Sequence, residues 1–328
     1  MISSGLSLLR ALNILAEQTE SKTLSKVVTE VRRDVETGTA LSVALARHPK
    51  AFNRLYVAMV RAGETGGVLD TVLVQLAETL EKQVALKQKI KSAMTYPVVV
   101  FVMVIGIVAA MLIFVVPMFT VLYKDLGGEL PLPTRILIGI SAVVSKFSYV
   151  VVAVAVAGTW RFRKYAATEK GRHVLDKLVL KTPVFGPLFH KTALSRFART
   201  LAVLIRSGVP ILQALEIVSE TAGNEVMRRA VIDIQTAVKE GQTLARPMAE
   251  HKIFPTMVVQ MLAVGEETGA MDTMLEKLAE FYDQEIEAMV AALTSLIEPL
   301  LIAFMGAAVG GMVIALYMPM FNIINLVQ

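Results

Sequence analysis

Two long stretches of this chain contain no charged residue, and they restrict its fold more than any other feature. They are residues 92–123 and 299–328, within a chain of 328 residues that is 55% hydrophobic. An α-helix rises about 1.5 Å per residue, so about 20 apolar residues cross the hydrocarbon core of a bilayer. Residues 96–123 and 297–321 are therefore predicted to be membrane spans 1 and 3 of an integral membrane protein.

A further apolar stretch, residues 136–160, contains one charge, Lys146. A lysine at the centre of a bilayer costs roughly 2.5–3.5 kcal/mol or more, which disfavours a span centred on it. If residues 143–162 form span 2, Lys146 lies near one end and can extend toward water. Residues 124–142 then form an external loop and interfacial segment.

Basic residues beside the spans predict the orientation in the membrane. Residues 161–200 carry ten Lys and Arg against two acidic residues, and lysines 82, 87, 89 and 91 precede span 1. Because cytoplasmic flanks are enriched in Lys and Arg, residues 1–95 and 163–296 are expected in the cytoplasm. The C-terminal tail, residues 322–328, is then outside. A cleavable signal peptide is not expected, because the first apolar stretch contains Arg10 and Glu17.

The chain contains an internal repeat. Residues 4–12 (SGLSLLRAL) match residues 207–215 (SGVPILQAL), and residues 63–70 (GETGGVLD) match residues 265–272 (GEETGAMD). The same register places Pro97 on Pro299, and residues 116–119 (VPMF) on 318–321 (MPMF). Self-similarity of this kind indicates a duplicated structural unit. Each unit is predicted to be a cytoplasmic helical domain followed by one outgoing span, with span 2 as the connector.

Each copy is expected to be a bundle of short antiparallel helices. In copy one the apolar periodicity and turn residues predict a first helix from Leu8 and two more over residues 21–37 and 41–47. A fourth helix is predicted from a cap at Asn53 to Gly63, and a long fifth helix from about residue 68. Copy two has an additional helix over residues 194–205, which copy one lacks, so the sequence is expected to be truncated at its N-terminus. The predicted fold class is an all-α membrane protein with two repeated cytoplasmic helical-bundle domains and three transmembrane helices.

The repeated Gly-Glu turn is the strongest local motif. Its residues are Gly63, Glu64, Gly67, Asp70, Gly265, Glu266, Gly269 and Asp272. Glycine ends helices and an aspartate favours the first turn of the next one, so a structural role explains these residue types. Two acidic turns that contact a partner or a cation are the alternative.

A second set of candidate residues marks the spans: Pro97, Pro117, Glu298, Pro299, Gly306, Gly310 and Pro319. Glu298 is an ionisable group at the start of span 3, which makes it a functional candidate. Gly306 and Gly310 have the spacing that lets two membrane helices approach closely, although glycine is also simply common in such helices. Pro117 and Pro319 lie near span ends, where they are expected to form exits or kinks.

The sequence lacks the residues that most enzyme classes need. It has no cysteine, no GxxxxGK[ST] phosphate-binding motif, and four histidines without metal-ligand spacing. No enzymatic activity, cofactor or metal is therefore expected. His48 and His251 occupy equivalent repeat positions, for which a helix-end role is favoured over a shared functional one. Basic surface without aromatic stacking residues does not predict nucleic-acid binding.

Taken in order around three spans, these motifs resemble those of the type II secretion F-protein and type IV pilus assembly platform family. Residues 130–134 (LPLPT), 183–187 (PVFGP) and 207–215 add to the paired turns. The departures are the missing first helix and the absence of proline in residues 4–7. The pilus members look somewhat closer than the secretion members.

The resemblance implies a non-enzymatic platform in the inner membrane that couples a cytoplasmic hexameric assembly ATPase to extraction and polymerisation of pilin or pseudopilin. It also implies contacts with other inner-membrane assembly proteins, the lipid bilayer and further copies of the chain. A small membrane transporter or channel is the alternative. Repeats that run in the same direction and spans that are almost free of polar residues disfavour it.

Overall fold

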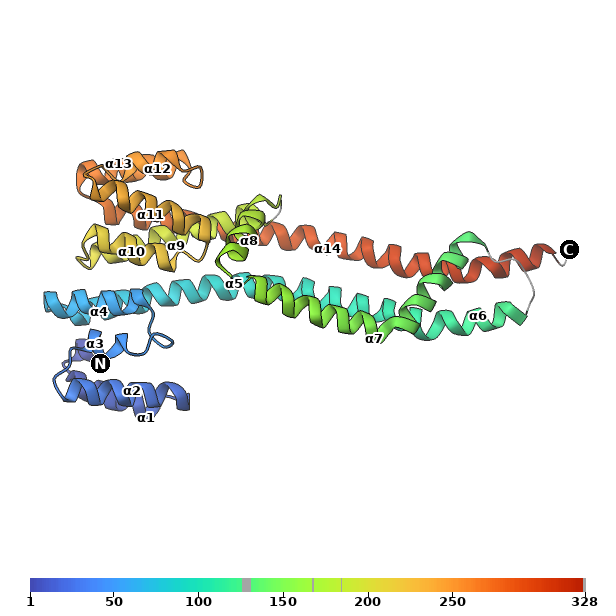
Figure 1. The fold of residues 1–328 in the computed structure, drawn as a ribbon, viewed down its shortest axis with the longest axis horizontal. Coiled ribbons are helices and arrows are strands. Elements are labelled where there is room, and N and C mark those ends of the chain that lie inside the picture. The colour runs from blue at the N-terminus through green and yellow to red at the C-terminus, as the bar shows by residue number, and fades with distance from the viewer. Residues whose placement is uncertain (126–130, 167, 184, 327–328) are drawn as a thin grey trace. The chain divides into compact units, whose positions relative to one another are not determined.

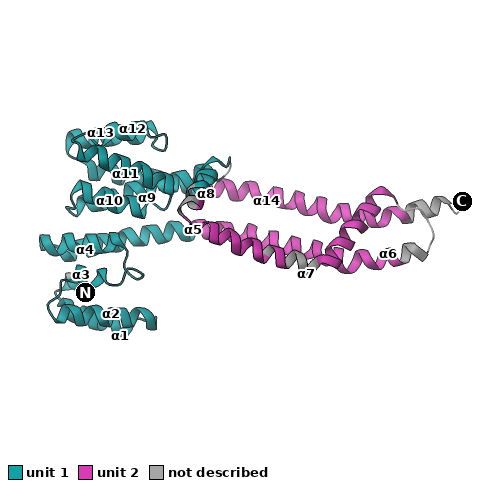
Figure 2. Cartoon of the chain, viewed as in Figure 1, with its two compact units in different colours: residues 1–88, 173–287 teal, residues 89–172, 288–328 magenta. Residues whose placement is uncertain are grey.

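The computed structural model describes residues 1–328 except 126–130, 167, 184 and 327–328. Every regular element in this described part is helical (Figure 1). The chain divides into two compact units (Figure 2). Unit 1 comprises residues 1–88 and 173–287, and unit 2 comprises residues 89–172 and 288–328.

The first part of unit 1 contains a short 3-10 helix, η1 (Ile2–Ser4), and helices α1 (Leu8–Gln18), α2 (Lys22–Glu36), α3 (Leu41–Ala46) and α4 (Arg54–Gly66), followed by the start of α5 (Leu69–Ala110). The predicted Asn53 cap of α4 is confirmed, because its side chain accepts a hydrogen bond from the amide of Tyr56 at 2.9 Å. The helix does not end at Gly63 as the sequence suggested. It continues to Gly66, because the left-handed conformation that stops it belongs to Gly67, with φ 69°.

The second part of unit 1 begins within α8 (Glu169–Lys181) and contains a similar series of helices, preceded by α8 and α9 (Gly186–Arg206). The series comprises α10 (Ile211–Thr221), α11 (Glu225–Lys239), α12 (Ala245–Glu250), α13 (Thr256–Thr268) and the start of α14 (Met271–Leu326). Helices α10 to α13 have 11, 15, 6 and 13 residues, the same lengths as α1 to α4. The lengths of these four helices therefore agree pairwise between the two parts.

Helix α9 lies at the centre of unit 1. The predicted helix over residues 194–205 is present, but it begins earlier, at Gly186, with a proline in its first turn. Phe197, Leu201 and Leu204 of this helix are fully buried and belong to one cluster with Met59 of α4 and Leu215 of α10. Helices from both repeat copies therefore share a single core, and α9 contacts α4 as well as α10.

Unit 2 contains the most apolar helices. Helix α5 continues through a π-helical turn, η2 (Met111–Val115), into α6 (Val116–Asp125), and α7 (Leu132–Ala166) and the rest of α14 complete the unit. Two helical segments of the described chain, Leu69–Val121 and Met271–Pro319, are long and apolar enough to cross a membrane. Their apolar stretches leave most side chains exposed, as expected of helices that face lipid. Span 2 is not among these segments and stays a prediction.

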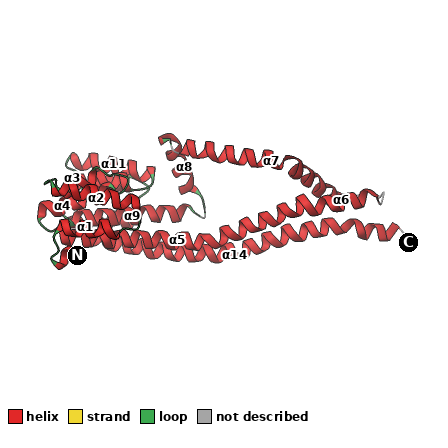
Figure 3. Cartoon of the chain, turned by 90° about the horizontal axis from the view of Figure 1, so that it is seen from below, coloured by secondary structure: helices red, strands yellow, loops and turns green. Residues whose placement is uncertain are grey.

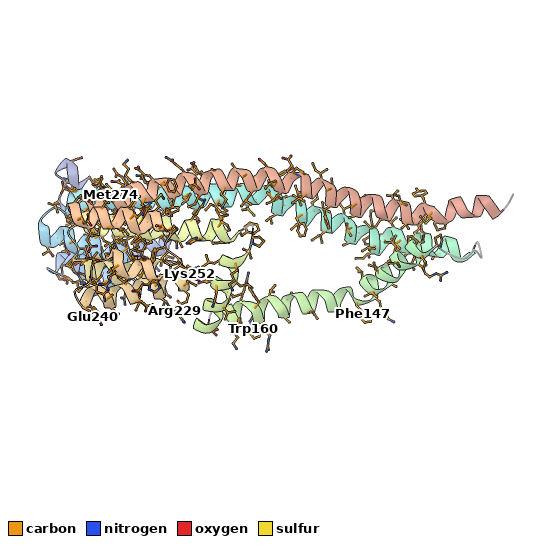
Figure 4. All side chains as sticks on the ribbon, turned by 90° about the horizontal axis from the view of Figure 1, so that it is seen from above. Phe147, Trp160, Arg229, Glu240, Lys252 and Met274 are labelled. Atoms are coloured by element: carbon orange, nitrogen blue, oxygen red, sulfur yellow. The ribbon has the colours of Figure 1, made fainter. Side chains whose placement is uncertain are left out.

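Helix α7 consists of two halves that differ in packing. Phe147 has non-helical angles (φ −110°, ψ 15°), so the helix breaks there. Before the break, Thr134, Leu137 and Ser141 are buried and contact α6, η2 and α14. After it, the described side chains through Trp160 are exposed (Figure 4). The bend between the two halves is visible in the path of α7 (Figure 3). The break lies four residues inside the predicted span 2, which is expected to begin at residue 143.

Candidate functional site

The Gly-Glu turn of copy one fastens two helices of that copy together. Glu64, on α4, accepts hydrogen bonds from the backbone amides of Leu41 at 2.5 Å and Ser42 at 3.0 Å. These amides lie at the start of α3 and have no partner within their own helix. A carboxylate satisfies them and also interacts favourably with the positive end of the helix dipole. Glu64 therefore caps a helix that precedes it by more than 20 residues.

Copy two repeats this contact. The two carboxylate oxygens of Glu266, on α13, lie 2.9 and 3.0 Å from the amide of Leu244, and one lies 3.4 Å from the amide of Ala245. Leu244 and Ala245 occupy the repeat positions of Leu41 and Ser42. The sequence suggested that this motif works through its glycines and aspartates. The structure assigns a specific contact to the glutamate, whose repetition at fixed spacing was the only signal in the sequence.

The glycines of the turn permit close helix packing. A Cβ atom added to Gly63 would lie 3.1 Å from the Cα of Leu69, and one added to Gly265 would lie 3.0 Å from the Cα of Met271. Both glycines are buried inside helices rather than at their ends. Gly67 and Gly269 instead adopt the left-handed conformation, with φ 69° and 70°, which favours glycine.

Asp70 and Asp272 lie in the first turns of α5 and α14, as expected. An acidic residue there is stabilised by the helix dipole. Asp272 also lies 3.5 Å from the guanidinium of Arg206, which binds Glu276 as well. The hydrogen bond from Arg206 lowers the pKa of Glu276 and, in return, raises the pKa of the guanidinium. Copy two therefore joins this turn to the end of α9 with an ion-pair cluster.

The repeat-equivalent histidines lie at helix ends beside carboxylates. His48 Nε2 is 3.7 Å from Glu30 Oε2, and His251 Nε2 is 3.8 Å from Asp233 Oδ2. Glu30 and Asp233 also occupy equivalent positions in the repeat. Within the described chain, no three His, Cys, Asp or Glu side chains lie together as a metal-ligand set.

An additional cluster surrounds Glu225 at the start of α11, and sequence analysis missed it. The carboxylate accepts two hydrogen bonds from Arg228, each 2.7 Å, and one from Arg229 at 3.0 Å (Figure 4 labels Arg229). The hydrogen bond from Arg228 contributes most to lowering the pKa of Glu225 to about 2. The same helix start is capped by Asn224 and by Asp176 of α8, whose side chain accepts from the amide of Glu225.

A polar contact line joins α9 to α14. Asp283 accepts hydrogen bonds from Ser195, at 2.5 Å, and from the buried guanidinium of Arg199. One turn away, Lys191 Nζ binds Glu285 at 2.5 Å. Because Asp283 lies more than 80 residues from its partners in sequence, local patterns gave no signal for this pairing.

The two copies also border a groove of about 760 Å³ between α3–α4 and α10. Arg54 crosses it, with its guanidinium 2.5 Å from Glu220 and 3.7 Å from Glu216. All three side chains are solvent-exposed, so the pairs contribute little to stability. The groove is a charged surface feature rather than an apolar ligand pocket.

The residues predicted at the starts of the spans lie within continuous helices. Pro97 is inside α5, and Pro299 is inside α14 directly after the exposed Glu298. Gly306 and Gly310 have open space around them, because an added Cβ would meet nothing within 4 Å in either case. The GxxxG face is therefore not used for packing within the described chain.

Pro117 and Pro319 do not end their helices. Helix α6 continues from Val116 to Asp125, and α14 continues to Leu326. Pro117 directly follows the π-helical turn, and each proline lies close to a side-chain hydroxyl bond from α7.

Comparison with known proteins identifies the family. The family model described as type II secretion system (T2SS), protein F, matches residues 1–117 and 197–319. The chain belongs to this family. Each of its two matched segments contains one set of the repeated motifs, residues 4–12 and 63–70 in the first and residues 207–215 and 265–272 in the second.

Curated members of the family match along the whole chain. The chain is 48% identical over 326 residues to a type IV pilus assembly protein PilC of Thermus thermophilus, and this match covers 99% of the chain and 80% of that protein. It is 45% identical over 332 residues to PilC of Myxococcus xanthus, covering 100% and 79%. A type II secretion system protein F of Pseudomonas aeruginosa is 36% identical over 327 residues, covering 100% and 81%.

Proposed function

We propose that this chain is the inner-membrane platform protein of a type IV pilus or type II secretion machine. In this role it couples a cytoplasmic assembly ATPase to extraction and polymerisation of pilin or pseudopilin, without enzymatic activity of its own. The observation that carries the proposal is the family match over both repeat copies. Each match ends in a helix that starts in unit 1 and continues as an apolar segment long enough to cross a membrane.

Pilus assembly is the favoured system. Identity to pilus assembly relatives ranges from 35% to 48%, against 34% to 36% for secretion relatives over a similar length. Deletion of the gene in its own host, followed by counting of surface pili and assay of secreted enzymes, tests this choice. Loss of pili with normal secretion is expected, and the reverse result would assign the chain to secretion.

The proposed topology has three spans, with residues 1–95 and 163–296 in the cytoplasm and the C-terminus outside. Span 2 is proposed to be residues 143–162, most of which follow the break in α7 at Phe147. Trp160 and the Lys164 ammonium, 5.5 Å from its ring centroid, suit the cytoplasmic interface, where aromatic and basic side chains anchor helices. The basic residues that follow the span support the same orientation.

Cysteine labelling tests this topology directly, because the natural chain has no cysteine. In intact cells, a membrane-impermeant maleimide is expected to leave Lys87→Cys and Arg196→Cys unlabelled, and to label both after permeabilisation. Lys124→Cys, in the external loop proposed from the sequence, serves as the outside control. Labelling of either cytoplasmic position in intact cells would contradict the proposed arrangement.

The proposed partners are the hexameric assembly ATPase, pilin or pseudopilin, other inner-membrane assembly proteins, and further copies of this chain. The open face around Gly306 and Gly310 leaves room for a second membrane helix. Detergent-solubilised full chain is expected to co-purify with the ATPase and with pilin after cross-linking in cells. Recovery of neither, at normal expression, would contradict the coupling role.

Glu298 is proposed to contribute to handling of the pilin in the membrane, because an exposed carboxylate precedes the apolar part of α14. Glu298→Gln is expected to reduce pilus yield while leaving membrane insertion intact. Glu267→Gln, at an exposed site in α13, is the control for loss of a carboxylate. Normal piliation of the Glu298→Gln strain would remove this role.

A further inference from the structure

The prolines near the ends of spans 1 and 3 each leave a backbone carbonyl without its helical donor. In an α-helix the N–H of residue i bonds to the carbonyl of residue i−4, and proline has no N–H. In α14, Pro319 therefore leaves the carbonyl of Ala315 unsatisfied. In a hydrocarbon environment no water is available to replace the missing donor.

Span 1 reaches the same situation through its π-helical turn. There the amide of Val116 bonds to the carbonyl of Met111, five residues earlier, instead of to Leu112. The next donor in this π register for Leu112 would be residue 117, which is a proline. The carbonyl of Leu112 therefore has no backbone partner along its own helix.

Two hydroxyl groups of α7 satisfy these two carbonyls. Ser141 Oγ donates a hydrogen bond to the carbonyl of Leu112, and Thr134 Oγ1 donates one to the carbonyl of Ala315. The oxygen–oxygen distance is 2.5 Å in both. Ser141 is 2% exposed and Thr134 is 0% exposed. The two residues are seven apart, so they lie on one face of α7, with Leu137 between them in the same buried cluster.

We propose that Thr134 and Ser141 form a hydroxyl clasp that positions the proline-containing segments of spans 1 and 3 against each other. The first half of α7 is then a membrane-embedded bracket rather than only an interfacial connector. This clasp presupposes, from the proposed function, that α5, α6 and α14 lie in lipid, but it does not depend on pilus assembly. It also gives Pro117 and Pro319 a role, because each proline leaves a free backbone carbonyl that accepts the hydrogen bond from Ser141 or Thr134.

The repeat explains why the clasp has two points and why they differ by one residue. Pro117 and Pro319 are equivalent, but the acceptor lies five residues before Pro117 and four before Pro319. The π-helical turn in span 1 accounts for this difference, because it adds one residue to the turn. The two hydroxyls of α7 therefore bond to equivalent proline-containing segments whose backbone registers differ by one residue.

Cysteine cross-linking in the purified full chain, reconstituted in lipid nanodiscs, tests the clasp. The rings of Phe119 and Tyr317 are 6.0 Å apart between α6 and α14, and those of Phe101 and Phe304 are 6.1 Å apart between α5 and α14. Paired cysteines at 119 and 317 report on the region of the clasp. Paired cysteines at 101 and 304 report on the same two spans farther from it.

Ser141→Ala and Thr134→Val are each expected to reduce cross-linking at 119–317 roughly threefold to tenfold, the range of single hydrogen bonds between membrane helices. Cross-linking at 101–304 is expected to stay unchanged, which a general loss of folding would not allow. Thr159→Val is the matched control, since the Thr159 hydroxyl bonds to its own helix in the exposed half of α7. Ser141→Thr and Thr134→Ser keep the hydroxyl and are expected to retain cross-linking.

Restoring the backbone donor provides the decisive comparison. Pro117→Ala supplies the N–H that bonds to Leu112 in the π register, and if the turn relaxes to the α register the amide of Val116 takes that place. In either case Leu112 gains a backbone donor, so Ser141→Ala is expected to have little further effect in that background. Pro319→Ala plays the same part for Thr134→Val. Equal effects with and without the prolines, or effects no larger than that of Thr159→Val, would overturn the clasp. If a hydroxyl variant fails to fold, rescue by the matching proline substitution supports the clasp, and failure of rescue counts against it.

Discussion

At the scale of single residues, the carboxylates of unit 1 act mainly on backbone amides and arginines. Glu64 and Glu266 each cap the start of a short helix that lies about 22 residues earlier in the chain. Helices of six residues, such as α3 and α12, are too short to be stable alone, so they depend on such contacts. The Gly-Glu turn is best explained by this structural role.

Replacement of Glu266 by glutamine is expected to destabilise unit 1 by about 1–2 kcal/mol, because a neutral amide is a weaker acceptor for the amides of α12. Thermal unfolding of the full chain in detergent measures the effect. Glu267→Gln, one residue later and exposed, is the control and should unfold at the same temperature as the natural chain. Equal unfolding temperatures for both variants would show that the cap contributes nothing.

Glu225 predicts a pH dependence. Its pKa is lowered from 4.5 to about 2 in the folded protein, so its ion pairs stabilise the fold fully above pH 4.5. As the pH falls from about 4.5 to about 2, this contribution is lost. It is about 1–2 kcal/mol after allowance for the solvent-exposed arginines. Glu225→Gln should lower stability at pH 7 and flatten the decline in this pH window, as measured by urea unfolding at several pH values.

At the scale of elements, buried glycines set how closely helices pack on either side of each turn. A methyl group on Gly265 would lie 3.0 Å from the backbone Cα of Met271, which cannot yield without displacing the start of α14. By contrast, Gly306 in the same long helix α14 has open space around it. Alanine substitutions at Gly265 and Gly306 therefore distinguish the effect of close packing from the preference of alanine for helix.

Gly265→Ala is expected to destabilise the chain by about 1–3 kcal/mol, the usual effect of overpacking. Gly306→Ala should leave stability unchanged or raise it slightly, because alanine favours helix by about 1 kcal/mol over glycine. Chemical unfolding of both purified variants measures the difference. A stable Gly265→Ala variant would mean that α13 and α14 tolerate a wider separation than the structure shows.

At the scale of the whole molecule, the two repeat copies form one cooperative core in unit 1, organised by α9. Phe197 of this helix is 1% exposed, and its ring lies 5.2 Å from that of Phe254. Its cluster also contains side chains of α2, α3 and α4. A core substitution that destabilises the second copy should therefore also destabilise the first.

Phe197→Ala is expected to destabilise unit 1 by about 3–5 kcal/mol. Hydrogen exchange should accelerate in α2 of copy one as well as in α11 of copy two, because both depend on the same core. Phe189→Ala, at a 49% exposed position of the same helix, is the control and should change stability by less than about 1 kcal/mol. Faster exchange in copy two alone would indicate two independent cores.

The sequence by itself determined the features that depend on local chemistry. Charge-free length determined the apolar segments of α5 and α14, turn residues determined the Asn53 cap, and self-similarity determined the order of the helices. These signals act over a few residues, so they are readable without knowing what packs against what. The family followed from the same motifs in their order along the chain.

The tertiary structure alone decided which distant groups meet. Nothing local shows that Glu64 reaches back to α3, that α9 serves both copies, or that Thr134 bonds to Ala315, 181 residues away. Such contacts arise because buried amides and carbonyls must find partners wherever packing places them. Helix α4 likewise continues past Gly63, because the left-handed residue that ends it is Gly67, and the packing of the turn decides which glycine takes that conformation.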